Sequence, residues 1–273
     1  MRLRPVAGIL LRQFYLFRSS PVRLFPTFAW VAIDIVVWGF LTRYLNSVAA
    51  SHSGGGAHVD FVPSLLGAVL FWDFFTRIMQ GVTTAFFEDI WSRNFLNLFA
   101  SPLSISEYVT GLVLTSIATS LIALAVMLIL ATLVFGLSFF SLGLMLIPFV
   151  LVLFLFGVAL GIFASALVLR LGPASEWLVW PMPALLSPFV GVYYPLATLP
   201  GWMQAIGAVL PPSYVFEGMR ALVSGQTFSA TSLLIGTGLA ILQLLLAGYF
   251  FARVFRYTVR TGLLARYSAE STS

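Results

Sequence analysis

The amino-acid sequence contains no cysteine and no lysine, and it has few charged residues of any kind. All of its 14 basic residues are arginine. Without cysteine, the chain can have no disulfide, thiolate metal site or cysteine nucleophile. Without lysine, it has no P-loop, because that motif places a lysine on the β- and γ-phosphates of a nucleotide. A nucleotide that drives this protein is therefore bound by another subunit.

The composition is that of a membrane protein. Hydrophobic residues make up 60% of the 273 residues and charged residues only 8%, whereas a soluble domain carries about 25% charged residues. The net charge of +5 does not indicate a nucleic-acid partner, since the arginines gather at the ends of apolar segments, as they do in membrane proteins. We therefore predict an all-α polytopic membrane protein in a lipid bilayer.

Residues 1–24 predict an amphipathic helix that lies in the membrane interface. Five arginines interrupt this apolar segment, so it lacks the long apolar core of a signal peptide. Arg12 falls opposite the apolar stripe, and Ser19–Pro21 ends the helix. A frayed cytoplasmic tail is the alternative. The apolar stripe consists of Val6, Leu10, Phe14 and Phe17. The residues expected at the membrane surface are Arg12, Phe14 and Arg18.

Six transmembrane helices are expected between residues 25 and 252. About 20 residues suffice to cross a hydrocarbon core of roughly 30 Å. The uncharged stretch from Tyr108 to Leu169 is long enough for two spans, with a turn at Gly136 and a kink at Pro148 in the second of them. The other expected spans are Phe25–Leu45, Phe61–Gln80, Trp177–Leu196 and Thr231–Ala252.

Prolines interrupt the chain repeatedly before the last span. They predict a bent or broken fifth span, and they cut residues 195–225 into pieces too short to cross a membrane. We therefore expect a re-entrant helical hairpin there. Ser213 is expected to cap its second helix, Glu217 and Arg220 to pair on it, and Gly225 to end it. The prolines within the fifth span are Pro181, Pro183 and Pro188.

The arginines also predict the orientation of the chain. With six spans and both termini in the cytoplasm, every arginine except Arg43 and Arg220 lies on the cytoplasmic side, as the positive-inside rule expects. A chain of five spans would place either the N-terminal or the C-terminal arginines outside. Residues 253–273 then form a basic cytoplasmic tail.

Ionisable residues within the spans are few. Asp34, in the middle of the first span, is either a hydrogen-bonded structural residue or a polar contact on a transport path. Asp73 and Arg77 are expected to pair near the cytoplasmic end of the second span. His52 and His58 lie in a predicted flexible loop, where nothing nearby completes a metal site. Trp30, Trp38 and Trp72 could line a path with Asp34, although packing or interfacial anchoring explains them equally well.

Polar residues concentrate in the segment Thr83–Glu107. Asp89 and Arg93 stand four residues apart, which supports a short helix over about residues 84–100. Ser104–Glu107 is a capping box directly before an apolar run, so it marks the start of the third span. A short cytoplasmic helix held between two spans suits force transfer from a cytoplasmic partner. A solvated loop is the alternative, but it leaves the aromatic residues of this segment without apolar contacts.

Two motifs and the arrangement of helices together resemble a known family. The first motif joins Glu88–Arg93 to Asn97–Ser104 and Glu107, and the second joins Leu199–Trp202 to Leu210–Arg220. With the amphipathic N-terminal helix and six spans, they resemble the membrane subunit of type-2 ABC exporters. That group includes polysaccharide, nodulation-factor and drug-export permeases.

This resemblance implies a homodimer of permeases in the bacterial inner membrane, docked on two copies of a separate ATP-binding subunit. ATP and magnesium then bind to the partner subunits, with no cofactor on this chain. By resemblance, Phe87–Phe99 is the coupling helix that the ATPase receives, the N-terminal helix is a second contact, and Pro200–Gly225 forms the extracellular gate region. The chain lacks the large external insertion of one subgroup. The implied coupling residues are Phe87, Glu88, Asp89, Ile90, Trp91, Arg93, Asn94 and Leu98. The implied gate residues are Pro200, Trp202, Pro211, Tyr214, Glu217 and Arg220.

Three functions are open from the sequence. The favoured one is a permease subunit, not itself an enzyme, of an ATP-driven exporter that moves an amphipathic, lipid-linked or drug-like molecule outward. The second is an ion-coupled secondary transporter in which Asp34 titrates. The third, a membrane-embedded transferase or hydrolase, lacks a convincing nucleophile, base or metal set.

Overall fold

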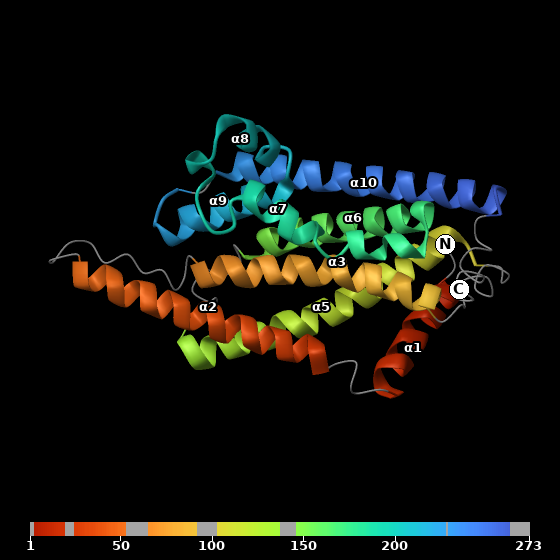
Figure 1. The fold of residues 1–273 in the computed structure, drawn as a ribbon, viewed down its shortest axis with the longest axis horizontal. Coiled ribbons are helices and arrows are strands. Elements are labelled where there is room, and N and C mark those ends of the chain that lie inside the picture. Colours follow the sequence, from red (N-terminus) through yellow and green to blue (C-terminus); the bar gives the residue numbers. More distant parts are fainter. Residues whose placement is uncertain are drawn as a thin grey trace.

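The computed structural model describes residues 3–19, 25–52, 65–91, 103–136, 146–227 and 229–262, and the regular structure within them is helical. Long helices lie side by side, with α1 (Leu3–Ser19) at one end of the bundle and the short helices α8 and α9 at the other (Figure 1). Within the described ranges, three helices are long and apolar enough to cross a membrane. The all-helical fold is confirmed, whereas six spans stay a prediction. The three helices are α5 (Ile105–Phe135), α6 (Leu146–Leu171) and α10 (Ala230–Arg260).

Helix α3 (Gly67–Trp91) lies at the centre of the bundle and packs against both α5 and α6. Helix α6 comes close because Gly161 faces α3. A Cβ atom on Gly161 would lie 2.8 Å from Cβ of Val82 and 2.9 Å from the carbonyl oxygen of Met79. Gly157, one turn earlier on α6, also faces α3. Small residues at this spacing let two helix backbones approach closely inside a membrane.

Helix α5 begins at the predicted capping box, which is confirmed. The Ser104 hydroxyl accepts a hydrogen bond from the Glu107 backbone N–H at 3.3 Å, and the Ser104 N–H donates to the Glu107 carboxylate at 3.1 Å. The helix ends at Gly136, where φ is +67°. Glycine adopts this left-handed conformation without the steric cost of a Cβ. The predicted break at Gly136 is therefore confirmed.

Helix α1 is amphipathic, but it turns a different stripe toward the bundle than predicted. Val6, Ile9 and Gln13 are buried, whereas Phe14 is 58% exposed. The reason lies on α5, where Gly111 leaves room for Ile9; a Cβ there would lie 2.8 Å from Cβ of Ile9. The apolar face that includes Phe14 is left free to meet lipid.

Helix α2 (Phe25–His52) is longer than the predicted first span and packs against α5. Residues 46–52, predicted as part of a loop, are helical, and His52 is the last residue of α2. His58 lies outside the described residues.

The second span also differs from its prediction. Helix α3 continues past Gln80 to Trp91 without a break, because the buried residues Val82 and Phe86 prolong its apolar stripe. Asp73 therefore lies in the first half of the helix, not near its cytoplasmic end. The predicted ion pair is confirmed, since Arg77 Nε donates to Asp73 Oδ2 at 2.6 Å. Arg77 therefore no longer supports the predicted orientation of the chain, which counted it among the arginines on the cytoplasmic side.

The predicted prolines act differently in the fourth and fifth segments. Pro148 lies in the first turn of α6, where a backbone N–H has no helical partner, so it does not produce the expected kink. The fifth segment is broken into the 3₁₀ helix η4 (Pro173–Leu178) and the helix α7 (Met182–Val190). Gly191, with φ at +67°, ends α7. The prediction of a bent or broken helix is correct, but a continuous helix over Trp177–Leu196 is not formed.

Short helices gather at the far end of the bundle. The 3₁₀ helix η5 (Leu196–Thr198) and α8 (Gly201–Gly207) precede α9 (Pro211–Val223). Ser213 does not cap α9 as predicted, because the helix already starts at Pro211 and the Ser213 N–H bonds the carbonyl of Leu210. Whether this hairpin re-enters a membrane stays a prediction.

Helix α10 continues past the predicted end of the last span at Ala252. Its final turns run to Arg260, so the first part of the predicted basic tail is helical. Arg253, Arg256 and Arg260 are exposed on these turns, and Arg266 lies outside the described residues.

Candidate functional site

Helix α1, the end of α3 and the start of α5 meet around one buried carboxylate. Asp89 has 0% exposure and lies in the last turn of α3. The hydroxyl of Tyr108 on α5 donates a hydrogen bond to its Oδ2 at 2.7 Å. The guanidinium of Arg12 on α1 forms a salt bridge with its Oδ1. We call these three residues the Asp89 cluster, and it ties three helices together through a single side chain.

The charge of Asp89 depends on its two partners. Asp89 lies beyond the first 20 or so residues of α3, which suffice to cross a membrane. Burial raises the pKa of Asp89 above its ordinary value, while the Tyr108 hydrogen bond and the Arg12 guanidinium act in the opposite direction. A buried carboxylate that loses its partner typically destabilises a protein by about 3–5 kcal/mol. The cluster therefore holds α1 and α5 firmly against α3.

A second contact ties the end of α3 to η4. The Trp91 indole Nε1 donates a hydrogen bond to Oε2 of Glu176 at 2.9 Å. The Phe87 ring lies beside both Trp91 and Trp180, with ring centroids 5.9 Å and 6.4 Å apart. The last turns of α3 thus contact α1, α5 and η4.

Five of the predicted coupling residues lie in the described part of the chain, and most of them face inward. Phe87, Asp89 and Ile90 are buried, Glu88 is partly buried, and Trp91 is 53% exposed. Asp89 is covered within this chain by Arg12 and Tyr108, and its coupling role stays a prediction. The sequence signal for the Asp89–Arg12 salt bridge was the charge of Arg12 on the predicted interface helix. The other three, Arg93, Asn94 and Leu98, lie outside the described residues.

The interface-helix residues divide in the same way. Arg12 is engaged by Asp89, whereas Phe14 and Arg18 are exposed. Phe14 and Arg18 therefore offer more surface to a membrane or a partner than Arg12, whose side chain is 27% exposed.

Three of the four predicted path residues come together. Asp34 and Trp38 from α2 and Trp72 from α3 line one cavity of about 290 Å³. Trp30 is 61% exposed and does not line it. The sequence analysis missed Tyr193, which contributes to the same cavity from the turn after α7.

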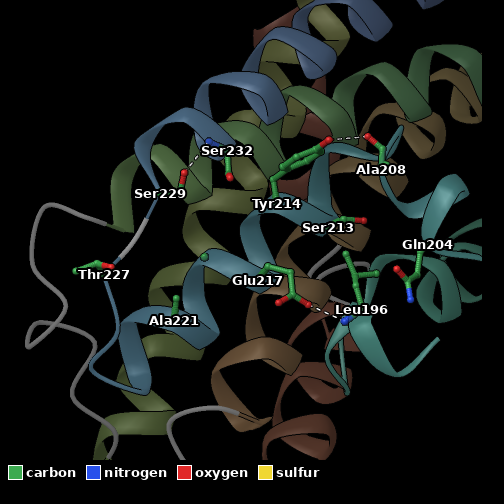
Figure 2. A pocket seen from close by; sticks show the side chains of 11 residues that line it. Leu196, Gln204, Ala208, Ser213, Tyr214, Glu217, Ala221, Thr227, Ser229 and Ser232 are labelled. Atoms are coloured by element: carbon green, nitrogen blue, oxygen red, sulfur yellow. Dashed lines mark hydrogen bonds between the residues drawn. The ribbon is translucent and has the colours of Figure 1, made fainter. Parts of the chain in front are cut away.

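Two of the six predicted gate residues, Tyr214 and Glu217, line a second pocket, of about 390 Å³, at the end of the bundle where α8 and α9 lie. Figure 2 shows Glu217 and Tyr214 of α9 in this pocket, with Gln204 of α8 on one side and Ser229 and Ser232 at the start of α10 on the other. Glu217 Oε1 accepts hydrogen bonds from the Leu196 N–H at 2.7 Å and from Arg220 at 2.8 Å, which confirms the predicted pair.

The remaining gate residues are structural parts of the same region. The Tyr214 hydroxyl donates to the carbonyl of Ala208 at 2.7 Å. Trp202 is 63% exposed and its ring lies 6.1 Å from that of Phe189. Pro200 is exposed, and Pro211 is buried at the start of α9.

Long apolar helices, an internal ion pair and a cavity between helices define a multi-pass helical membrane protein. The model of the ABC-2 type transporter family matches residues 9–223, and the chain belongs to that family. A comparison with curated proteins gave no match. The chain is thus a transport subunit of an ABC transporter, and the family implies association with an ABC ATP-binding subunit. This membership favours the exporter over the ion-coupled carrier and over a membrane-embedded enzyme.

Proposed function

We propose that the chain is the permease subunit of an ATP-driven exporter in a bacterial inner membrane, with both termini in the cytoplasm. It works as a homodimer with two ATP-binding subunits, which hold ATP and magnesium. Its cargo is an amphipathic, lipid-linked or drug-like molecule. The family match supports the permease role, and the missing lysine supports nucleotide binding on a partner.

The Asp89 cluster is the observation that carries the coupling part of the proposal. Helix α3 includes the first residues of the expected coupling segment, Phe87–Phe99, and ends at Trp91, with Asp89 in its last turn. A displacement of that segment therefore acts first on Asp89. Because Asp89 is bound to both Arg12 and Tyr108, the displacement reaches α1 and α5 together.

The proposed cycle follows from these connections. ATP binding closes the partner ATPases, which push the segments that follow α3. The motion is passed through the Asp89 cluster to the neighbouring helices, and a path opens between the two permease copies.

The test uses the complex of the chain with its ATP-binding subunit, reconstituted in liposomes. The Asp89→Asn variant keeps the shape of the side chain but removes its charge, so it weakens the link to Arg12. We expect the complex to assemble, with ATP hydrolysis no longer tightly coupled to export. The matched control is Trp30→Leu, an exposed position on α2 that should leave coupling unchanged.

Two results would overturn the proposal. One is that no ATP-binding subunit associates with the chain. The other is export that persists without ATP and disappears only in Asp34→Asn, which would establish the ion-coupled carrier.

A further inference from the structure

Four aromatic residues contribute to the lining of the cavity between α2, α3 and the segment around α7. Trp38 stacks on Tyr193, with ring centroids 5.2 Å apart and planes 10° from parallel. Trp72 contacts Phe75 behind it, at 4.8 Å between centroids. The volume of about 290 Å³ is close to the lower limit of pockets that bind small molecules. The aromatic residues that line it are Trp38, Trp72, Trp180 and Tyr193.

Two carboxylates, Asp34 and Asp73, line the same cavity. Arg77 engages Asp73 through two hydrogen bonds, Nε to Oδ2 at 2.6 Å and Nη2 to Oδ1 at 3.2 Å. Within the described residues, no hydrogen bond or salt bridge is found at Asp34. Two acids thus line the cavity beside one guanidinium, which hydrogen-bonds Asp73, so one negative charge is in excess when all three side chains are ionised.

A carboxylate among apolar helices destabilises the bundle unless it is protonated or a counter-charge is present. A cation supplied by a ligand provides that counter-charge. Aromatic faces add to the attraction, because the negative face of a tryptophan or tyrosine ring draws a cation within about 6 Å of its centroid. Aromatic side chains and a carboxylate without a salt bridge are together the recognition chemistry of an organic ammonium group.

A neutral hydroxylated ligand fits the cavity less well. Thr76 and Ser187 contribute hydroxyl groups to the lining, and sugars do stack on tryptophan. Such a ligand, however, leaves the charge of Asp34 without a partner. The observations therefore favour the cation.

We propose that this cavity binds the cationic group of the transported molecule, an organic ammonium carried on an apolar or aromatic body. That the bound molecule is transported rests on the proposed function. The cavity adds to that function the chemical class of the substrate. Asp34 supplies the counter-charge, Trp38 and Tyr193 form the aromatic face, and the Asp73–Arg77 pair keeps the second acid neutralised.

The experiment measures equilibrium binding to the full-length chain, purified in detergent, with no ATP present. The probe is radiolabelled phenyltrimethylammonium, whose charge is permanent, and the competitor is tert-butylbenzene, its neutral isostere. We expect the cation to bind saturably and the isostere to displace it poorly. In Asp34→Asn the affinity for the cation should fall about tenfold or more, a change of about 1.4 kcal/mol. Trp38→Leu should weaken binding as well.

Trp30→Leu is the matched control, since it removes a tryptophan from the same helix at a position that does not line the cavity. Binding in this variant should equal that of the unaltered chain. The assignment is overturned if cation and isostere bind equally or if Asp34→Asn binds the cation unchanged. It is also overturned if methyl glucoside displaces the probe equally well in the unaltered chain and in Asp34→Asn.

The outcome is separable from that of the proposed function. Saturable, Asp34-dependent cation binding in a chain that recruits no ATPase supports this site and rejects the exporter. Coupled ATP-driven export with no cation binding supports the exporter and rejects this site.

Discussion

At the scale of single residues, the decisive feature is a buried charge that is shared between helices. Asp89 was predicted as a coupling residue on a short cytoplasmic helix, and in the structure it has no exposed area. A carboxylate can be buried at low cost only where donors surround it, and here they come from Arg12 and Tyr108. Asp89, which was predicted to couple the chain to an ATP-binding subunit, therefore positions α1 and α5 against α3.

Removing the Tyr108 hydroxyl should weaken the bundle at this point. Tyr108→Phe keeps the ring, which is fully buried, but deletes the donor to Asp89. Because the acceptor is charged, we expect a loss of about 1.5–3 kcal/mol in the free energy of unfolding. The measurement is reversible unfolding by SDS in mixed micelles.

The control for this variant is Tyr249→Phe, at an exposed tyrosine on α10. Its effect should stay within about 0.5 kcal/mol, as for most surface substitutions. Equal effects of the two substitutions would contradict a special role for the Tyr108 hydroxyl.

At the scale of elements, the packing of α6 on α3 is set by glycine. Gly157 and Gly161 bring the two backbones together, so that contacts between whole helices depend on the absence of two side chains. This close approach also explains why α3 is buried along most of its length. Helix α3 carries both Asp89 of the Asp89 cluster and Trp72 of the aromatic cavity.

Adding one methyl group to that interface should be costly. In Gly161→Ala the new Cβ would meet the Met79 carbonyl oxygen at 2.9 Å, and backbone cannot move away as a flexible side chain can. We expect a loss of about 1–3 kcal/mol in the free energy of unfolding, typical of overpacking. The same SDS titration measures it.

Gly248→Ala on α10 is the matched substitution, since no atom lies within 4 Å of the added Cβ. There the higher helix propensity of alanine should stabilise the chain by up to about 1 kcal/mol. A lower free energy of unfolding in Gly161→Ala and a higher one in Gly248→Ala would support close packing at Gly161. A higher free energy of unfolding in Gly161→Ala would refute it.

At the scale of the whole molecule, the bundle has two distinct ends. Helix α1, η4 and the last turns of α10 lie at one end, and α8 and α9 lie at the other (Figure 1). The exposed arginines on the last turns of α10 agree with a cytoplasmic position for the first end, as the positive-inside rule expects.

The absence of cysteine allows a direct test of this orientation. Ala197→Cys in η5 and Thr261→Cys after α10 each introduce one thiol at an exposed position in a chain that has none. A membrane-impermeant maleimide should label the first variant in cells with a permeabilised outer membrane and the second only after the inner membrane is opened. The reverse pattern would invert the proposed topology.

Local features of the fold could be predicted from sequence because they depend on neighbouring residues. The capping box at Ser104, the break at Gly136 and the Glu217–Arg220 pair each involve groups within a few residues of one another. Element ends were predicted less well. Helix α3 continues beyond Gln80 and α10 continues beyond Ala252. Both helices still have buried residues there, although polar residues interrupt the apolar sequence.

The sequence by itself determined the membrane class, the absence of a P-loop and the chemistry of the candidate residues, because composition and short spacing suffice for these. Only the tertiary structure decided that Asp89 meets Arg12 and Tyr108, that Trp91 bonds Glu176, and that Asp34 shares a cavity with Trp72. These partners come from different helices. Which helix faces lie together is set by packing, chiefly where glycines such as Gly111 and Gly161 permit close approach, and no local pattern encodes it.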